Sequence, residues 1–305
     1  MKVVGLFPGQ GSQSVGMGSE FFNSSESVKE LFSEADKSLG FSLSELCFNG
    51  PIEELTLTKN AQPAILVTSF AAFQLAGLKL SAGAGHSLGE YTALVAAGVI
   101  TFSDAVNLVH KRGSYMQEAV PAGEGAMVAV MGPSEEEISS VISQVESGVC
   151  EIANLNSPGQ TVVAGSSAGI ESFSEKMKEA GGKVIPLNVS APFHCSLMQP
   201  AAEKLAADLD AITFNDPSFP IYANYSAEAV NAGDQARELL KKQVCGSVRW
   251  TDSIQKLFAE VTPTHTVEFG AGGVLSKLQK RIDKSATILQ IDKPESLEKV
   301  KEALA

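Results

Sequence analysis

The sequence predicts an α/β protein in which a small ferredoxin-like domain is inserted into a larger α/β domain. Short apolar runs alternate with helical periodicity along the 305 residues, which is typical of strands and helices packed in layers. From about Gly125 the predicted order is β-α-β-β-α-β, the split pattern of a ferredoxin-like unit. We therefore assign residues 1–123 and 191–305 to the large domain and residues 124–190 to the inserted one.

The first part of the large domain begins with a predicted strand at residues 2–7, which ends in the turn-rich loop Pro8–Gln13. The small residues of Lys79–Gly85 form the second predicted strand. Apolar periodicity predicts helices at Ser27–Leu39, at Gln62–Leu75, at Glu90–Ala97 with Gly98 as its stop, and from a cap at Ser103 or Asp104 through Arg112.

The inserted domain and the rest of the large domain follow the same alternation. The insert has predicted strands at Ala126–Val130, Cys150–Asn154, Thr161–Ala164 and Lys183–Leu187, with helices at Ser134–Ser147 and Gly169–Ala180. After Ser190 the predicted elements are helices Leu197–Leu209, Asp234–Gln243, Asp252–Phe258 and Val274–Ile282, and strands Pro220–Ala223 and Thr266–Phe269. The helix ending at Ile282 completes the predicted fold.

The composition indicates a globular protein with a real core, because 44% of the residues are hydrophobic and 19% are charged. No apolar run approaches the roughly 20 residues of a membrane span, and no basic segment followed by an apolar one marks a signal peptide. We expect a cytoplasmic protein with no membrane contact, or one of the plastid stroma if a transit peptide has been removed.

The charge and the cysteines narrow the function classes further. A net charge of −12 disfavours binding to nucleic acid or to an anionic membrane. An anionic substrate must therefore meet a local basic group, and only four arginines are available: Arg112, Arg237, Arg249 and Arg281. The four cysteines lack C-x-x-C spacing, so neither a zinc site nor a dithiol is predicted.

The strongest local motif is Gly85-His86-Ser87-Leu88-Gly89. In a nucleophile elbow, a serine lies on a sharp turn between a strand and a helix, and the flanking glycines let the backbone pass closely. The positive end of the following helix favours a developing oxyanion. The alternative interpretation is a plain strand-turn-helix corner.

A nucleophilic serine needs a base, and four histidines are available. His86 adjoins Ser87 and should point away from its hydroxyl, while His110 lies inside a predicted helix. The usual order of a hydrolase favours His265, which comes just before the last predicted strand. His194 lies in a loop that opens a helix, and the spacing alone does not separate it from His265. Either residue also fits a structural histidine.

Three other sequence patterns have both a functional and a structural interpretation. The loop Pro8–Gln13 supplies backbone N–H groups for an oxyanion hole or is a simple Pro-Gly turn. Gly83-x-Gly85-x-x-x-Gly89 does not meet the spacing of a dinucleotide fingerprint. Cys195, next to His194, is a candidate thiolate, but a small core cysteine explains it as well.

Several motifs together resemble one family along nearly the whole chain. They are Phe7-Pro8-Gly9-Gln10-Gly11-Ser12-Gln13, Gly85-His86-Ser87-Leu88-Gly89-Glu90-Tyr91, Arg112-Gly113, Asn156-Ser157-Pro158-Gly159-Gln160, Phe193-His194-Cys195, and Gln243 before Val248-Arg249-Trp250. The sequence is similar to the malonyl-CoA:acyl carrier protein transacylases of type II fatty acid synthesis. That resemblance implies an α/β-hydrolase-like large domain with a ferredoxin-like insert.

The resemblance also implies the chemistry. Ser87 matches the nucleophile and His194, not His265, matches the base, which a backbone carbonyl of Gln243 orients. The N–H groups of Leu88 and Gln10 match the oxyanion hole.

The remaining site residues follow in the same way. Arg112 matches the arginine that binds the malonyl carboxylate, while His86 and Phe193 join the substrate-binding set. Phe193 resembles malonyl-type rather than methylmalonyl-type enzymes.

The implied partners are malonyl-CoA as substrate and acyl carrier protein as a transient partner, with no metal, no separate cofactor and a monomeric enzyme. Lys277, Lys280, Arg281 and Lys284 lie at helical spacing and form a candidate docking patch for the acidic carrier, or else a solvated helix face. A serine hydrolase with the same elbow and a non-catalytic nucleotide-binding module are the alternative functions.

Overall fold

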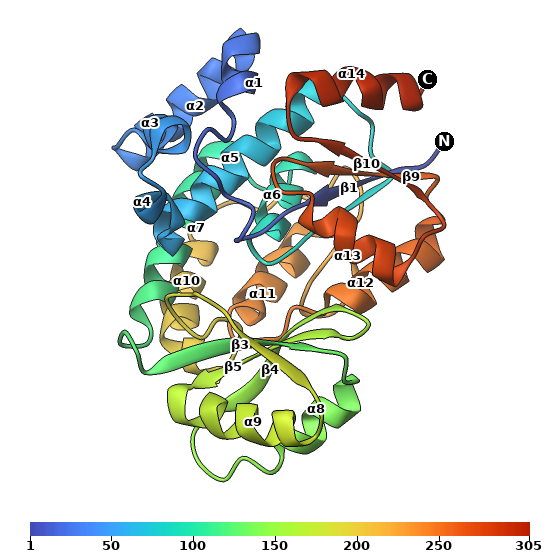
Figure 1. Ribbon diagram of the computed structural model, residues 1–305. Helices are drawn as coiled ribbons and strands as arrows, with labels where there is room; N and C mark the ends of the chain where they lie inside the picture. Colours follow the sequence, from blue (N-terminus) through green and yellow to red (C-terminus); the bar gives the residue numbers. More distant parts are fainter.

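The computed structural model describes residues 1–305 and contains two sheets (Figure 1). The larger sheet has the order β10-β9-β1-β2-β7-β8 and the smaller has the order β4-β5-β3-β6. The strands of the larger sheet are β1 (Val3–Phe7), β2 (Ala82–Gly85), β7 (Ile221–Tyr222), β8 (Ala229–Val230), β9 (His265–Phe269) and β10 (Thr287–Ile291). Those of the smaller sheet are β3 (Gly125–Met131), β4 (Cys150–Ser157), β5 (Gln160–Ser166) and β6 (Lys183–Pro186).

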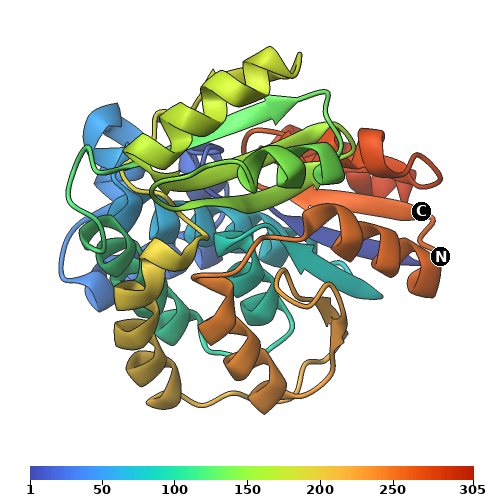
Figure 2. The same ribbon diagram turned by 90° about the horizontal axis from the view of Figure 1, so that it is seen from below.

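The larger sheet is parallel except for β8, which pairs antiparallel with β7. Figure 2 shows β1, β2 and β9 (blue, teal and orange) side by side. Because these strands run the same way, Phe7, Gly85 and Phe269 all lie at the carboxyl edge of the sheet, where loops of α/β proteins build their sites.

Helices cover both faces of this sheet, so its central strand β1 is buried on both sides. Phe7 belongs to the main core with α5, whereas Val4 and Leu6 pack with α12 and α13 in a second core. The helices of the large domain are α1 (Ser19–Ser24), α2 (Glu26–Leu39), α3 (Leu43–Asn49), α4 (Ile52–Thr56), α5 (Thr58–Ala76), α6 (Leu88–Ala96), α7 (Phe102–Glu118), α10 (Gln199–Asp210), α11 (Gly233–Gln243), α12 (Trp250–Val261), α13 (Val274–Ile282) and α14 (Pro294–Ala303).

The smaller sheet is antiparallel throughout, as the β-α-β-β-α-β pattern predicts. In β3, Val128 and Val130 pack against α8 (Glu135–Ile142) and α9 (Ser167–Glu179), whereas Met127 and Ala129 join the main core. This period-2 alternation makes the sheet a layer between its own helices and the large domain. Figure 1 shows α8 and α9 on the side of the sheet that faces away from the large domain.

The predicted fold class, an α/β-hydrolase-like large domain with an inserted ferredoxin-like domain, is confirmed. All four strands of the small sheet lie between Gly125 and Pro186, inside the predicted insert. None of the helices has the length and apolar character that a membrane crossing requires.

Several element predictions were wrong. The fold does not end at Ile282, because β10 and α14 follow and β10 forms an edge of the large sheet. The short helices α1, α3 and α4 and the two-residue strand β8 were not predicted, because a few residues carry too little periodicity. Helix α8 ends at Ile142 rather than Ser147. The cap of α7 is Thr101, whose side chain accepts from the Asp104 N–H.

Candidate active site

Ser87 lies on a sharp turn between β2 and α6, with φ 51° and ψ −107°. Non-glycine residues seldom adopt positive φ, so this backbone is strained and its surroundings must hold it. A Cβ at Gly85 would lie 1.9 Å from the Gly89 backbone, and one at Gly89 would lie 1.9 Å from the Phe7 carbonyl oxygen. Both glycines are therefore required by close backbone approach, as in a nucleophile elbow.

The structure places His194, not His265, beside Ser87. The Ser87 Oγ lies 2.7 Å from His194 Nε2, and His194 Nδ1 lies 2.9 Å from the Gln243 carbonyl oxygen. Because a carbonyl only accepts, Nδ1 carries the proton and Nε2 is free to accept from the hydroxyl. Burial, assisted by the positive charge of Arg112, lowers the pKa of His194 to about 3. The imidazole is therefore neutral and able to act as a base.

Arg112 is a buried cation that no acidic side chain pairs within the protein. Its Nη1 donates to Gln62 Oε1 at 2.7 Å, and its Nη2 donates at 3.0 Å to both Ser87 Oγ and Gln243 Oε1. The Nε–H is buried and has no partner. Since a guanidinium has five N–H donors, two have no partner within the protein.

The adjacent Gly113 explains how Arg112 reaches this position. A Cβ at Gly113 would lie 2.6 Å from the Lys59 Cα and from the Thr58 carbonyl oxygen. The missing side chain lets α7 approach α5 closely, which brings Arg112 against Gln62 on α5. The Arg-Gly pair therefore has a packing reason as well as a chemical one.

Two backbone N–H groups are available near the elbow. Leu88 is the first residue of α6, so its N–H has no partner within the helix and lies at the positive end of the helix dipole. Gln10 lies in the loop after β1, and its side chain donates to Thr58 Oγ1 at 3.3 Å. Both residues line the same cavity as Ser87.

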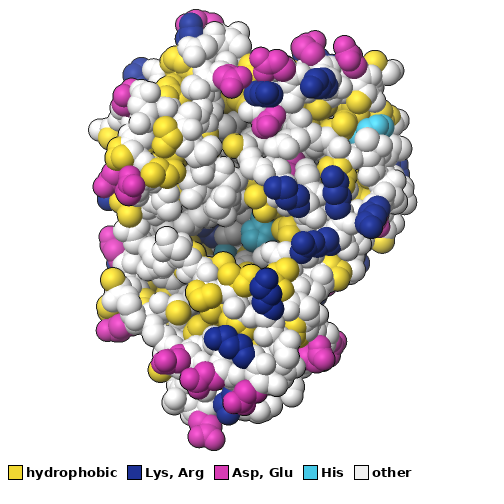
Figure 3. Space-filling view, in the orientation of Figure 1, with side chains coloured by type: hydrophobic (Ala, Val, Ile, Leu, Met, Phe, Trp, Pro, Cys, Tyr) yellow, Lys and Arg dark blue, Asp and Glu magenta, His cyan; other side chains and the backbone are white.

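That cavity has a volume of about 320 Å³ and lies between the two domains. The large domain contributes the polar groups already described, while the apolar wall comes mostly from the small domain and the segment after it. The wall residues are Met116, Met127, Val162, Leu187, Val189 and Phe193. Figure 3 shows a hollow at this junction with a histidine side chain (cyan) in it. A polar floor and an apolar wall suit a small acyl group.

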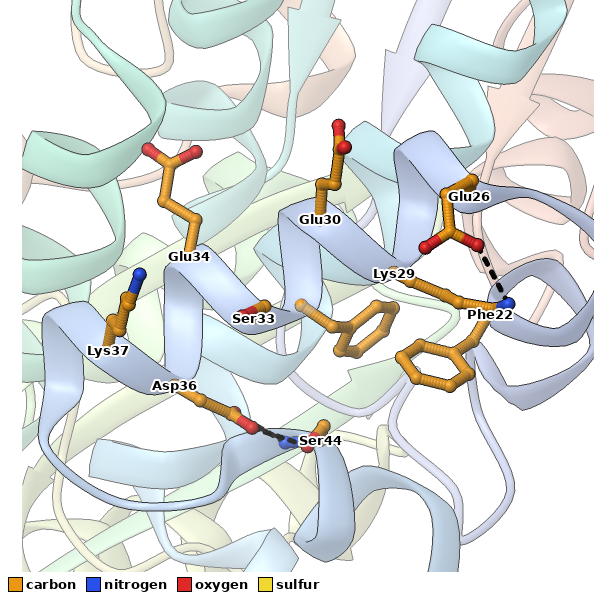
Figure 4. A pocket seen from close by; sticks show the side chains of 10 residues that line it. Phe22, Glu26, Lys29, Glu30, Ser33, Glu34, Asp36, Lys37 and Ser44 are labelled. Carbon is orange, nitrogen blue, oxygen red and sulfur yellow. Dashed lines mark hydrogen bonds and ion pairs between the residues drawn. The ribbon is translucent and has the colours of Figure 1, made fainter.

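A larger hollow of about 780 Å³ lies on the outer surface of α2 and contains none of this chemistry. Figure 4 shows Glu26, Glu30 and Glu34 along the helix with Phe22 beside them. These carboxylates face solvent, and the hollow has no histidine, no cysteine and no buried cation among its lining residues. The smaller cavity is therefore the candidate active site.

The other sequence candidates lie elsewhere. His86 Nε2 is 2.7 Å from Asn156 Oδ1, which joins the elbow to the small domain on the cavity wall. His110 Nδ1 forms a hydrogen bond with the Lys59 carbonyl oxygen. His265 begins β9, at the amino end of the sheet, so it cannot reach a serine at the carboxyl end. Burial raises the pKa of the Cys195 thiol to about 12, and its Sγ donates to the Pro192 carbonyl, which fits a core cysteine.

Three buried residues that the sequence analysis did not single out surround the site: Gln62, Glu90 and Asn224. Gln62 binds the guanidinium of Arg112, and Asn224 accepts from the Ser87 N–H at 2.6 Å. Glu90 follows the elbow motif directly, so its position beside the nucleophile was available from the sequence. Asn224 comes just after β7, at the same sheet edge, but only the strand order reveals that.

Comparisons with known proteins show the family to which the chain belongs. The model of the acyl transferase domain family matches residues 4–295. A malonyl CoA-acyl carrier protein transacylase of Bacillus subtilis is 48% identical over 303 residues, which cover 97% of this chain and 95% of the relative. The chain belongs to the malonyl CoA-acyl carrier protein transacylase family. The same-named protein of Escherichia coli K12 is 44% identical, covering 96% of each chain.

Solved structures of this transacylase family share the fold. The crystal structure from Clostridium perfringens has a TM-score of 0.96 and 43% identity, and covers 100% of this chain and 97% of the other. A second structure, of a type II PKS acyl-carrier protein in complex with its malonyl-transacylase, has a TM-score of 0.96 and 39% identity, and covers 99% and 100%. The family predicted from the motifs is confirmed.

Proposed function

We propose that this protein transfers the malonyl group from malonyl-CoA to the phosphopantetheine thiol of an acyl carrier protein, through a malonyl ester on Ser87. The observation that carries the proposal is that one hydroxyl meets both a neutral base and an unpaired buried cation. His194 Nε2 lies 2.7 Å and Arg112 Nη2 lies 3.0 Å from Ser87 Oγ. The base activates the nucleophile, and the cation selects an acyl group that ends in a carboxylate.

In the first half-reaction, Ser87 Oγ attacks the thioester carbonyl while His194 Nε2 accepts the hydroxyl proton. The carbonyl oxygen becomes an oxyanion, which the N–H groups of Leu88 and Gln10 stabilise. When the carbon–sulfur bond breaks, the coenzyme A sulfur takes the proton from His194 and leaves. The Gln243 carbonyl holds the imidazole in the required tautomer and stabilises its transient positive charge.

The second half-reaction reverses these roles. The carrier thiol gives its proton to His194, and its sulfur attacks the ester carbonyl. Ser87 Oγ then leaves with the proton, so the free enzyme is restored. No bound cofactor or metal takes part, and we propose that one chain carries the complete site.

Arg112 supplies the selectivity for a malonyl group. The guanidinium has no carboxylate partner in the protein, so its two unused N–H donors favour a substrate that brings one. A neutral acyl group such as acetyl would leave the buried charge uncompensated, which costs free energy. Phe193 and the methionines of the cavity wall pack against the short acyl chain.

The test is the intact mass of the protein after brief mixing with malonyl-CoA. We expect a single malonyl adduct on the wild type and none on Ser87→Ala, because the ester oxygen is removed. Subsequent addition of acyl carrier protein should transfer the adduct to the carrier. An adduct that survives Ser87→Ala contradicts the covalent mechanism. Loss of the adduct to water at the same rate with and without carrier would indicate a hydrolase.

The basic side chains of α13 are the candidate docking surface for the acidic carrier. Lys277, Lys280 and Arg281 on α13 are exposed, as is Lys284, which lies beyond the end of the helix at Ile282 rather than on it as predicted. None of the four forms an ion pair. Figure 3 shows Lys and Arg side chains (dark blue) gathered beside the hollow, where α13 lies in Figure 1. Arg281 also donates to Gln160 Oε1 at 2.8 Å, which ties this helix to the small domain.

Charge reversal tests this surface. The double variant Lys277→Glu/Lys280→Glu should raise the KM for the carrier about fivefold, the equivalent of about 1 kcal/mol for exposed charges. Acylation of Ser87 by malonyl-CoA should not change. The matched control is Lys178→Glu, on the opposite side of the small domain in α9, where the carrier KM should stay constant. Equal carrier kinetics in both variants would exclude α13 as the docking surface.

A further inference from the structure

We infer that Glu90 is a positioning residue that fixes the nucleophile and the base relative to each other, through Asn224 on one side and Gln243 on the other. The inference rests on the proposed function only in that Ser87 and His194 are taken as the reacting pair. Glu90 does not line the cavity and touches no substrate. Its role follows from three connected sets of hydrogen bonds.

Asn224 braces the strained backbone of the elbow. Its Oδ1 accepts from the Ser87 N–H at 2.6 Å, and its Nδ2 donates to the Gly85 carbonyl at 2.7 Å. One completely buried amide therefore holds the chain on both sides of His86. A positive φ at a serine persists only where such contacts over-determine it. The position of Ser87 Oγ depends on where Asn224 is held.

Gln243 braces the base and the cation together. Its carbonyl oxygen accepts from His194 Nδ1, and its side-chain Oε1 accepts from Arg112 Nη2 at 3.0 Å. Its Nε2 donates to the Ser87 carbonyl at 3.0 Å. Because Oε1 faces a guanidinium, the amide cannot be flipped without placing two donors together. The orientation of His194 therefore depends on where Gln243 is held.

Glu90 joins these two braces at a single atom. Its Oε2 accepts from the Asn224 backbone N–H at 2.9 Å and from Gln243 Nε2 at 2.8 Å. Glu90 is 2% exposed and forms no ion pair. Burying an acid without an ionic partner costs free energy, and an apolar residue would avoid that cost. What an apolar residue cannot supply is one acceptor that receives both donors.

The experiment measures the single-turnover rate of Ser87 acylation by malonyl-CoA in Glu90→Gln and Glu90→Leu. Leucine removes the shared acceptor, so we expect the rate to fall about 10²-fold, the usual consequence of misplacing a reacting group by about 1 Å. Glutamine keeps one carbonyl oxygen that accepts both bonds and should restore most of the rate. The KM for malonyl-CoA should stay within about twofold, because Glu90 does not touch the substrate.

The matched control is Glu268, another buried carboxylate of the large domain. It is completely buried and accepts from the N–H groups of Leu275 and Ser276 at 3.1 and 2.7 Å, away from the cavity lining. Glu268→Leu should lower the Tm and leave the acylation rate of the folded protein unchanged. A similar rate loss in both leucine variants, or a wild-type rate in folded Glu90→Leu, would overturn the inference. If Glu90→Leu does not fold, Asn224→Ala replaces it, with a loss of at least tenfold expected.

A second readout separates this inference from the proposed function. An organophosphonate that labels activated serines reports on Ser87 and His194 without malonyl-CoA. If the wild type reacts with the phosphonate but not with malonyl-CoA, the proposed function is wrong. In that case the inference about Glu90 is still supported if the rate of reaction with the phosphonate falls in Glu90→Leu and recovers in Glu90→Gln. An unchanged phosphonate rate in both variants would reject it.

Discussion

The two ends of the large sheet differ in how their polar groups are held. At the carboxyl end, Ser87, His194 and Arg112 are joined through buried amides, and the serine backbone is strained. At the amino end, Lys2 Nζ donates to the Val261 carbonyl at 2.8 Å and His265 Nδ1 lies 3.0 Å from a neighbouring threonine hydroxyl. These amino-end contacts are exposed to solvent.

The difference follows from the parallel arrangement. Loops that leave the carboxyl ends of β1, β2 and β7 all meet at one edge, so residues far apart in the sequence become neighbours there. At the buried carboxyl edge of the sheet, the low dielectric strengthens each hydrogen bond, and the loss of one costs free energy. At the exposed edge water replaces a lost partner. Substitutions at the two ends should therefore have unequal effects.

The histidines give the largest expected contrast. His194→Ala removes the proton acceptor of Ser87, so the acylation rate should fall about 10³-fold, as for loss of a general base. His265→Ala should leave the rate unchanged, because this residue begins β9 at the opposite end of the sheet. Stopped-flow release of coenzyme A measures both. A comparable loss in the two variants would contradict the assignment of His194 as the base.

The glycines give the next contrast, in stability. Gly89→Ala would push a methyl group to 1.9 Å from the Phe7 carbonyl oxygen, so we expect the free energy of unfolding to fall by about 3 kcal/mol or more. Gly77, which follows α5 and precedes the amino end of β2 by five residues, has a positive φ, unlike Gly89, but lies in open space. Gly77→Ala should cost only about 1 kcal/mol, from backbone strain. Urea unfolding measures both, and equal losses would exclude close packing as the reason for Gly89.

Much of this contrast could be predicted from the sequence. The elbow glycines, the serine and the order of elements in the insert are local patterns, and local patterns survive folding. The choice between His194 and His265 is not local, because it depends on the direction of each strand in the sheet. Residue spacing alone left them equal, and only the resemblance to a family favoured His194.

The supporting network was missed for a related reason. Asn224 follows a strand of two residues, and Gln62 is one of several polar residues in a helix that is mostly buried. Neither pattern distinguishes a buried brace from an ordinary polar residue. Glu90 was quoted within a motif, but no periodicity indicates that its carboxylate holds Asn224 and Gln243. Such roles become visible only when distances are known.

The smallest expected effect is on the pH dependence of stability. Burial, the largest cause, raises the pKa of Glu90 to about 7 from 4.5. Between those values the folded protein keeps a proton that the unfolded chain releases. The stability that this proton contributes is therefore fully present below about pH 4.5 and is lost as the pH rises towards 7, by at most about 1.4 kcal/mol per pH unit.

His194 works in the opposite direction, because burial lowers its pKa from 6.5 to about 3 and its contribution is lost as the pH falls through that range. The contributions of Glu90 and His194 to the pH dependence of stability partly cancel in the wild type. Glu90→Gln removes only the Glu90 contribution, so the difference in stability between the wild type and this variant isolates it. Urea unfolding at pH 5, 6 and 7 should show the stability advantage of the wild type over Glu90→Gln shrinking as the pH rises. An advantage that stays constant would mean that Glu90 is already ionised at pH 5, and that the carboxyl-end network holds a carboxylate rather than a neutral acid.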